Sequence, residues 1–159
     1  MKDEVFVDLE HEKLEIRVIR QDDLEAVIKL DEANTGFRRE SYLTLKFQDC
    51  LTKSGIVVSL VAVSKGMVVG FIMGDLYYGA FGRTENSVTI TSLAIEPELA
   101  GQKIGSGLLE QFMQNVKALK VQYIDTLVDW DQNFDLLGFF RASGFNPGRR
   151  IHLYVELDS

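Results

Sequence analysis

The stretch SVTITSLAIEPELAGQKIGSGLLEQF, residues 87–112, decides the fold of this chain. Its first part, Val88 to Ile95, is rich in β-branched residues and favours a strand. Pro97 lacks an N–H group and biases Glu96 towards an extended conformation, which marks the end of that strand. From Ile104 onward the apolar residues fall at helical spacing: Leu108, Leu109, Phe112, Met113 and Val116. The stretch therefore predicts a strand, a glycine-containing turn and a helix.

The predicted turn has two interpretations. Gly101 and Gly105 flank the point where the helix begins, and a helix start leaves unpaired N–H groups with a partial positive charge. Glycines there remove the Cβ atoms that would keep an anion away, so one interpretation is a phosphate or pyrophosphate site. The other is that the glycines only mark a loop. Neither the Walker sequence G-x-x-x-x-G-K-[ST] nor the dinucleotide fingerprint G-x-G-x-x-G occurs here.

The same stretch resembles motif A of the GNAT superfamily of N-acetyltransferases, V-x-P-x-x-R/Q-G-x-G-x-G/A followed by a Leu-rich helix. One register aligns Gln102, Gly105 and Gly107 as Q-x-x-G-x-G, but it misplaces Pro97. The register that we prefer preserves more positions, namely Ile95, Pro97, Gly101, Ile104, Gly105, Leu108 and Leu109. It places Ala100 where Arg or Gln is usual and Lys103 where a glycine is usual.

The resemblance implies a binding site for acetyl-CoA made largely of backbone N–H groups. The residues that it implicates are Leu93, Ala94, Ile95, Gly101, Gln102, Lys103, Ile104, Gly105 and Ser106. A later segment, with Asn133, Phe140, Gly144 and Phe145, is similar to the family pattern N-x-x-A-x-x-x-Y-x-x-x-G-F, and it adds Asn133 and Phe140 to the predicted cofactor-binding set. Relatives use the tyrosine of this pattern to protonate the departing thiolate. Phe140 has no proton to donate.

Acylation of an amine also needs a group that removes the ammonium proton. Asp129, predicted at the C-terminal end of a strand, is the first candidate for this base, and Thr91 is a candidate to order a water molecule. The alternatives are Asp31, Glu32 and Asp75. Trp130, Arg38, Arg39 and Tyr42 have two interpretations each, as residues that contact the acceptor or as ordinary packing and surface residues.

Elsewhere the patterns predict strands over 14–19, 56–64, 67–78 and 121–128 and a final strand within 144–157, with helices from 22 or 23 to 36, over 39–51 and over 133–142. Lys65-Gly66 is a hairpin loop, and Gly70 and Gly74 indicate a bulge or a close backbone approach. We expect a mixed α/β domain spanning residues 1–159, with a mostly antiparallel twisted sheet flanked by helices. This is the order of elements in a GNAT fold.

Composition excludes several classes of protein. The net charge of -7 argues against binding to nucleic acid, and no apolar run approaches the roughly 18 residues of a membrane span. The acidic start does not resemble a secretory signal. A single cysteine, Cys50, rules out an internal disulfide and fits a reducing cytoplasm. Two separated histidines give no zinc motif, so we expect no metal.

Together these observations favour an acetyl-CoA-dependent N-acetyltransferase that acts on a primary amine of a small molecule, a peptide N-terminus or a lysine. An alternative is a GNAT-like module that binds acyl-CoA without turnover, and a third is a protein that uses the fold alone. The expected partners are acyl-CoA and an amine acceptor. The sequence leaves open the identity of the acceptor, the acyl chain length and whether the chain forms a homodimer.

Overall fold

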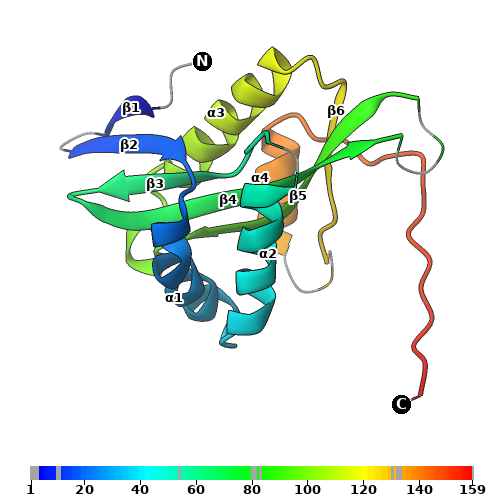
Figure 1. The fold of residues 1–159 in the computed structure, drawn as a ribbon, viewed down its shortest axis with the longest axis horizontal. Coiled ribbons are helices and arrows are strands. Elements are labelled where there is room, and N and C mark those ends of the chain that lie inside the picture. Colours follow the sequence, from blue (N-terminus) through cyan, green and yellow to red (C-terminus); the bar gives the residue numbers. More distant parts are fainter. Residues whose placement is uncertain are drawn as a thin grey trace. The chain divides into compact units, whose positions relative to one another are not determined.

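The computed structural model describes residues 4–9, 12–53, 55–79, 82, 84–129, 131 and 134–158. Contacts divide the chain into two units, Met1–Leu127 and Val128–Ser159. The first unit holds the sheet and three of the helices, and the second holds one helix and the C-terminal segment (Figure 1).

The sheet of the first unit has six strands in the order β1-β2-β3-β4-β5-β6. Neighbouring strands are antiparallel except for β5 and β6, which are parallel. The strands are β1 (Glu4–Leu9), β2 (Glu12–Val18), β3 (Leu60–Ser64), β4 (Met67–Tyr78), β5 (Asn86–Ile95) and β6 (Tyr123–Thr126). The predicted mixed α/β class with a mostly antiparallel sheet is confirmed.

Three helices cover this sheet: α1 (Leu24–Thr35), α2 (Glu40–Thr52) and α3 (Ile104–Ala118). Short 3-10 turns, Gln21–Asp23 and Pro97–Leu99, precede α1 and follow β5. Gly36 ends α1 in the left-handed conformation, with φ of 80°, and its N–H donates to the carbonyl of Glu32. Among the described residues, no helix combines the length and the apolar character that a membrane span needs.

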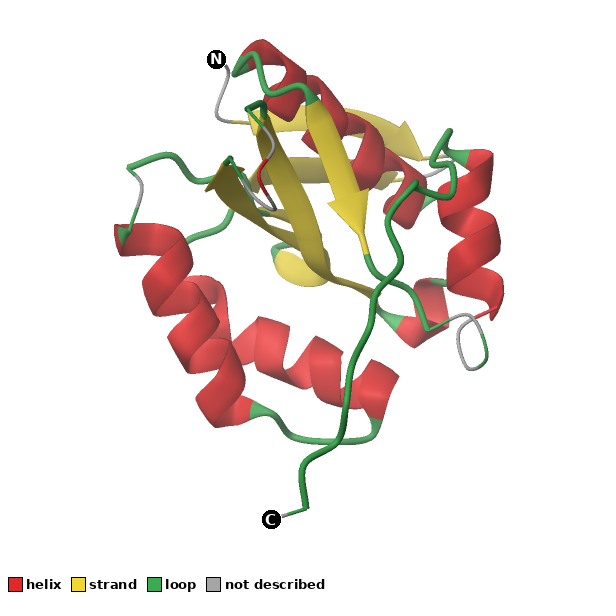
Figure 2. Cartoon of the chain, turned by 90° about the vertical axis from the view of Figure 1, so that its right-hand side faces the viewer, coloured by secondary structure: helices red, strands yellow, loops and turns green. Residues whose placement is uncertain are grey.

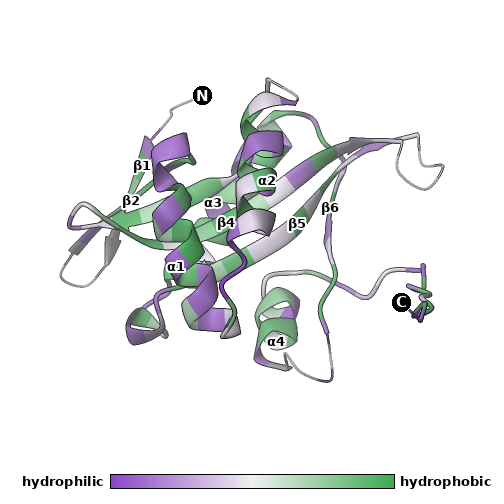
Figure 3. Cartoon of the chain, turned by 60° about the horizontal axis from the view of Figure 1, so that its bottom comes forward, coloured by the Kyte–Doolittle hydropathy of each residue, from purple (hydrophilic) through white to green (hydrophobic). Residues whose placement is uncertain are grey.

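The helices lie on both faces of the sheet, with α1 and α2 on one side and α3 on the other (Figure 2). On the first side a core forms from Val27, Ile28 and Leu30 of α1, Leu43 and Phe47 of α2, and Val61, Val63, Phe71 and Met73 of the strands. The amphipathic character of α1 is visible as green and purple bands in Figure 3. On the other side α3 packs Leu108 and Phe112 against β4.

Two glycines of β4 allow this second contact. A Cβ atom at Gly70 would lie 2.8 Å from Cδ1 of Ile95, and one at Gly74 would lie 2.7 Å from Cζ of Phe112. The β4–β5 register also shifts between Met73 and Gly74. The sequence-based prediction of a bulge or a close backbone approach at these glycines is confirmed in both respects.

The second unit contains α4 (Phe134–Ala142), followed by residues 145–158 without a helix or a strand (Figure 1). The final strand predicted within 144–157 is therefore wrong. Its alternating side chains are exposed, Ile151 at 84%, Leu153 at 85%, Val155 at 78% and Leu157 at 85%. Alternation predicts that a segment can pair, but a strand also needs the edge of a neighbouring strand, and within the described chain this segment has none.

The other differences concern the ends of elements. The prediction missed β1, whose backbone pairs with β2 from Glu4↔Arg17 to Leu9↔Glu12. Strand β3 begins at Leu60 rather than at Ile56, and β6 spans only Tyr123–Thr126. The predicted single domain over residues 1–159 stays a prediction.

Candidate active site

Strand β5 extends beyond the strand beside it. Its pairing with β6 covers only Ser87↔Tyr123 to Ile90↔Thr126, whereas β5 continues to Ile95. The N–H of Glu96 donates to the carbonyl of Val69 at 2.8 Å, towards β4. Because backbone groups of a strand alternate in direction, the N–H groups of Leu93 and Ile95 point away from β4. We call residues 91–95 of β5 the open edge.

A bulge lies where the open edge begins. Met73 pairs with Ser92 and Gly74 pairs with Ile90, which leaves Thr91 as an extra residue on β5. The Thr91 hydroxyl contacts the carbonyl of Met73 at 3.4 Å. A bulge reverses the direction of the backbone groups and bends the strand, and such bulges are common next to active sites.

The chain then turns into α3 through two left-handed residues, Gly101 with φ of 86° and Lys103 with φ of 63°. No atom outside its immediate chain neighbours would lie within 4 Å of a Cβ at Gly101. The N–H of Gly107 donates to the carbonyl of Lys103 at 3.0 Å, so the helical hydrogen bonds begin there. The N–H groups of Ile104, Gly105 and Ser106 have no acceptor within the described part of the chain. This first turn can accept an anion.

Not every predicted residue of the turn is equally available. The N–H of Gln102 already donates to the carbonyl of Leu99 at 3.3 Å. The side chain of Ile104 is 2% exposed and anchors α3 in the core, so only its backbone can face a ligand. Lys103 and Ser106 are exposed, and their side chains can reach a bound anion.

The alternative acids are held in ion pairs. Asp31 is buried and accepts hydrogen bonds from Arg39 at 2.9 and 2.5 Å. Asp75 accepts one from Lys46 at 2.6 Å. The carboxylate of Glu32 lies 3.4 Å from Arg38. All three acids therefore already have a cationic partner in the first unit.

Arg38, Arg39 and Tyr42 also have partners within the first unit. Arg38 pairs with Glu25, Glu32 and Glu40 at 3.3–3.4 Å. The guanidinium of Arg39 lies 4.9 Å from the ring centroid of Tyr42. The hydrogen bond to Asp31, opposed by burial, raises the pKa of Arg39 above its ordinary value.

In the second unit, the predicted residues have separate surroundings. Asp129 is exposed and lies beyond the end of β6, outside any strand. Phe140 is 3% exposed, with its ring centroid 5.4 Å from that of Phe139 and 5.0 Å from that of Phe145. The N–H of Phe145 also donates to the carbonyl of Phe140. Phe140 is thus a packing residue of this unit. Asn133 and Trp130 lie outside the described residues.

Sequence reasoning missed two polar contacts beside the open edge. The Thr89 hydroxyl donates to Oδ1 of Asp125 at 2.5 Å, where β5 and β6 still pair. The side-chain amide of Asn34 donates to the carbonyl of Ile95 at 3.1 Å, which satisfies one acceptor of the open edge. Neither pair carries a sequence signal, because both depend on which segments the fold brings together.

Two comparisons with known proteins gave matches. The model of the acetyltransferase (GNAT) family matches residues 23–145. Among solved structures, the aminoglycoside N-acetyltransferase AAC(6')-Iy in complex with CoA matches with a TM-score of 0.79 and 13% identity, covering 94% of this chain and 99% of that chain.

Two further structures have the same fold. An aminoglycoside acetyltransferase from an uncultured soil metagenomic sample, in complex with trehalose, matches at a TM-score of 0.72 and 19% identity, covering 91% of this chain and 97% of that one. The ribosomal-protein-S18-alanine N-acetyltransferase from Escherichia coli matches at a TM-score of 0.69 and 15% identity, covering 85% of this chain and 79% of that one. No curated protein sequence matched this chain.

Proposed function

We propose that this chain, which belongs to the GNAT family of acetyltransferases, transfers the acetyl group of acetyl-CoA to a primary amine by direct attack within a ternary complex. The observation that carries the proposal is the open edge of β5 followed at once by the anion-accepting first turn of α3. Acetyl-CoA has a matching shape, with a pyrophosphate at one end and an amide-rich pantetheine chain leading to the thioester.

The residues present suit this ligand. The N–H groups of Ile104, Gly105 and Ser106 would hold the pyrophosphate, with Gly101 leaving room for it. The N–H groups of Leu93 and Ile95 would bind the pantetheine chain and polarise the thioester carbonyl. Lys103 would add a positive charge near the phosphates. Ala94 is 7% exposed and supports the open edge from within the core.

Acetyl-CoA supplies an activated acyl group and a thiolate leaving group. The acceptor nitrogen forms the new C–N bond as the C–S bond breaks, and the extra proton on nitrogen leaves to a base. Asp129 remains our proposal for that base, and Thr91 for ordering a water molecule. With Phe140 in place of the family tyrosine, we propose that solvent protonates the thiolate, which is already a good leaving group with a conjugate-acid pKa of about 8.5.

A second candidate function is binding of acyl-CoA without turnover. The packing of Phe140 among Phe139 and Phe145 favours it, since the family's proton donor is replaced by a core residue. The test is release of the CoA thiol from acetyl-CoA in the presence of a panel of primary amines. Amine-dependent release with a matching acetylated product supports the transferase, and binding without release across the panel supports the second function.

A matched variant examines the base. Asp129→Asn should lower kcat by about 10²-fold, because general-base catalysis contributes roughly 10²–10⁴-fold. Asp131→Asn is the control, since Asp131 is also exposed and lies nearby in the sequence. Equal rates for wild type and Asp129→Asn would assign the proton transfer to another group.

A further inference from the structure

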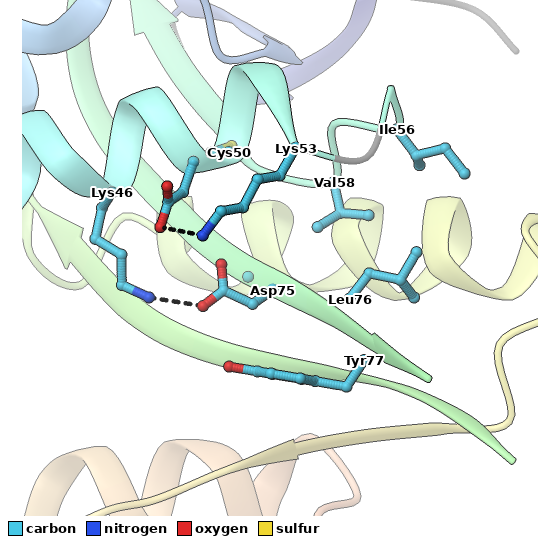
Figure 4. A pocket seen from close by; sticks show the side chains of 10 residues that line it. Lys46, Cys50, Lys53, Ile56, Val58, Asp75, Leu76 and Tyr77 are labelled. Carbon is cyan, nitrogen blue, oxygen red and sulfur yellow. Dashed lines mark hydrogen bonds and ion pairs between the residues drawn. The ribbon is translucent and has the colours of Figure 1, made fainter. Parts of the chain in front are cut away.

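A pocket of about 270 Å³ lies between α2 and β4, and none of its lining residues belongs to the open edge or to the first turn of α3. Four charged side chains line it: Lys46 and Asp49 from α2, Lys53 directly after the end of α2, and Asp75 from β4. Figure 4 labels Lys46, Lys53 and Asp75. Two are cations and two are anions, so the lining is neutral overall. This balance differs from the net charge of -7 of the whole chain.

The two ion pairs of the pocket differ in their access to solvent. Nζ of Lys46 lies 2.6 Å from Oδ2 of Asp75, and these side chains are 24% and 25% exposed. Nζ of Lys53 lies 3.1 Å from Oδ2 of Asp49, with side chains that are 74% and 50% exposed. The Lys46–Asp75 pair is the inner one, and its charges act through a lower effective dielectric.

The inner pair keeps capacity for further hydrogen bonds. An ammonium group has three donors, and a carboxylate has two oxygen atoms with about four acceptor positions. Within the described part of the chain, Lys46 and Asp75 hydrogen-bond only to each other, through Oδ2. A ligand can therefore place an anionic group on Lys46 and a cationic group on Asp75 without breaking the pair.

Beside these charges the pocket has an apolar wall. Ile56, Val58 and Leu76 line it, and Val58 is 4% exposed. Tyr77 lies next to the Lys46–Asp75 pair (Figure 4). An aliphatic group of a few carbons would bury its apolar surface against this wall, which favours binding.

We propose that this pocket binds a small zwitterion with an aliphatic side chain, of the chemical class of an apolar α-amino acid. A ligand with one charge would leave an uncompensated charge in a partly desolvated site, which is costly, whereas a zwitterion extends the existing ion pair into a neutral group of four charges. The volume also excludes large ligands, because drug-sized molecules occupy pockets of roughly 300–1,000 Å³.

The experiment is a titration of the ¹⁵N-labelled protein, followed by amide chemical shifts, with three ligands that carry the same isobutyl group. L-leucine carries both charges, 3-methylbutylamine carries only the cation and 4-methylpentanoate only the anion. We expect L-leucine to shift the amides of residues 46–53 and 74–77 and to bind at least ten-fold more tightly than either analogue. Unmoved amides with L-leucine, or equal affinity for all three ligands, would overturn the proposal.

Variants connect the binding to the inner pair. Lys46→Met and Asp75→Asn should each lower the affinity for L-leucine by at least ten-fold. Arg38→Gln is the control, because Arg38 belongs to an exposed cluster outside the pocket, and it should leave this affinity unchanged.

A second readout does not depend on these variants. Cys50 lines the pocket and is the single cysteine of the chain, so L-leucine should slow its alkylation in the wild-type protein. An unchanged alkylation rate at saturating L-leucine would contradict occupation of the pocket. Neither readout requires acetyl-CoA, so this proposal and the proposed transferase function can fail independently.

Discussion

Gly74 of β4 faces the ring of Phe112 of α3 so closely that a methyl group at Gly74 would lie 2.7 Å from Cζ and 3.2 Å from Cε2. Phe112 is fully buried. The next residue, Asp75, pairs with Lys46 of α2. Successive residues of a strand point to opposite faces, so this one position fixes α3 on one side of the sheet and α2 on the other.

We therefore predict that Gly74→Ala destabilises the protein by about 1–3 kcal/mol, the usual cost of overpacking a core. Chemical denaturation measures the change. Replacing Phe112 by Leu in the same chain should recover part of the loss, because the smaller side chain leaves room for the methyl group. Gly138→Ala is the control, since Gly138 has open space around it and a helix favours alanine by about 1 kcal/mol. A Gly74→Ala protein as stable as the wild type would contradict the close contact.

Lys103 gives a prediction about the first turn of α3. Its left-handed conformation, with φ of 63°, costs a non-glycine residue about 1–2 kcal/mol. Lys103→Gly should remove that strain. Glycine also gains freedom in the unfolded chain, which offsets part of the gain, so the net stabilisation should be about 0.5 kcal/mol. Lys103→Ala keeps the strain and should give no gain.

The same two variants separate charge from backbone in ligand binding. Both variants lose the ammonium group, so both should lower the affinity for acetyl-CoA by the same factor of about 2–5, as expected for one exposed charge. Calorimetric titration measures this. If Lys103→Gly binds as tightly as wild type while Lys103→Ala does not, the backbone conformation and not the charge is what matters at this position.

The ion pair between Arg17 and Asp23 predicts a dependence of stability on pH. Two hydrogen bonds of 2.8 Å join these side chains, and the N–H of Arg20 donates to Asp23 at 2.7 Å. Burial opposes the charge on Asp23, but these hydrogen bonds outweigh it and hold the pKa of Asp23 below its ordinary value. The stabilisation is therefore complete above the unfolded pKa of about 3.9 and is lost as the pH falls through the lower folded pKa.

Asp23→Asn should accordingly cost about 3 kcal/mol at pH 7, because it leaves the Arg17 charge without its partner. The gap between the unfolding free energies of variant and wild type should narrow as the pH falls below about 4. Glu4→Gln is the control, since the Glu4–Arg20 pair is exposed and 3.5 Å long, and it should cost less than about 1 kcal/mol. A gap that stays constant from pH 7 to pH 2 would show that the Asp23 charge contributes nothing.

Most of the fold could be predicted from local pattern. The β-branched run before Pro97, the hairpin at Lys65-Gly66 and the end of α1 at Gly36 are decided by neighbouring residues, and all three are found. The final strand was predicted wrongly because Ile151 to Leu157 carry the alternation of a strand, but pairing depends on an edge elsewhere in the molecule. Strand β1 was missed although four of its six residues, Val5, Phe6, Val7 and Leu9, are apolar. Its place in the sheet depends on the pairing with β2, which the local pattern does not reveal.

Part of the candidate site could likewise be predicted from the sequence, and part depends on the fold. The turn around Gly101 and Gly105 could be recognised because backbone chemistry depends on glycine and on helix position, both visible in the sequence. The open edge could not, since it results from the lengths of β5 and β6 taken together. The hydrogen bond between Thr89 and Asp125 depends on the register in which β5 pairs with β6. The ion pair between Asp31 of α1 and Arg39, the residue before α2, depends on how these two helices pack.

The most direct test of this account is calorimetric titration of acetyl-CoA into the wild-type protein, Gly105→Asp and Gln114→Asp. Gly105 lies in the first turn of α3, where aspartate favours the helix but repels a phosphate. Gln114 is exposed further along the same helix. We predict micromolar binding to the wild type and to Gln114→Asp, and loss of at least 100-fold in Gly105→Asp with its melting temperature retained. No binding to the wild type at millimolar acetyl-CoA, or equal binding to all three proteins, would contradict the proposed site.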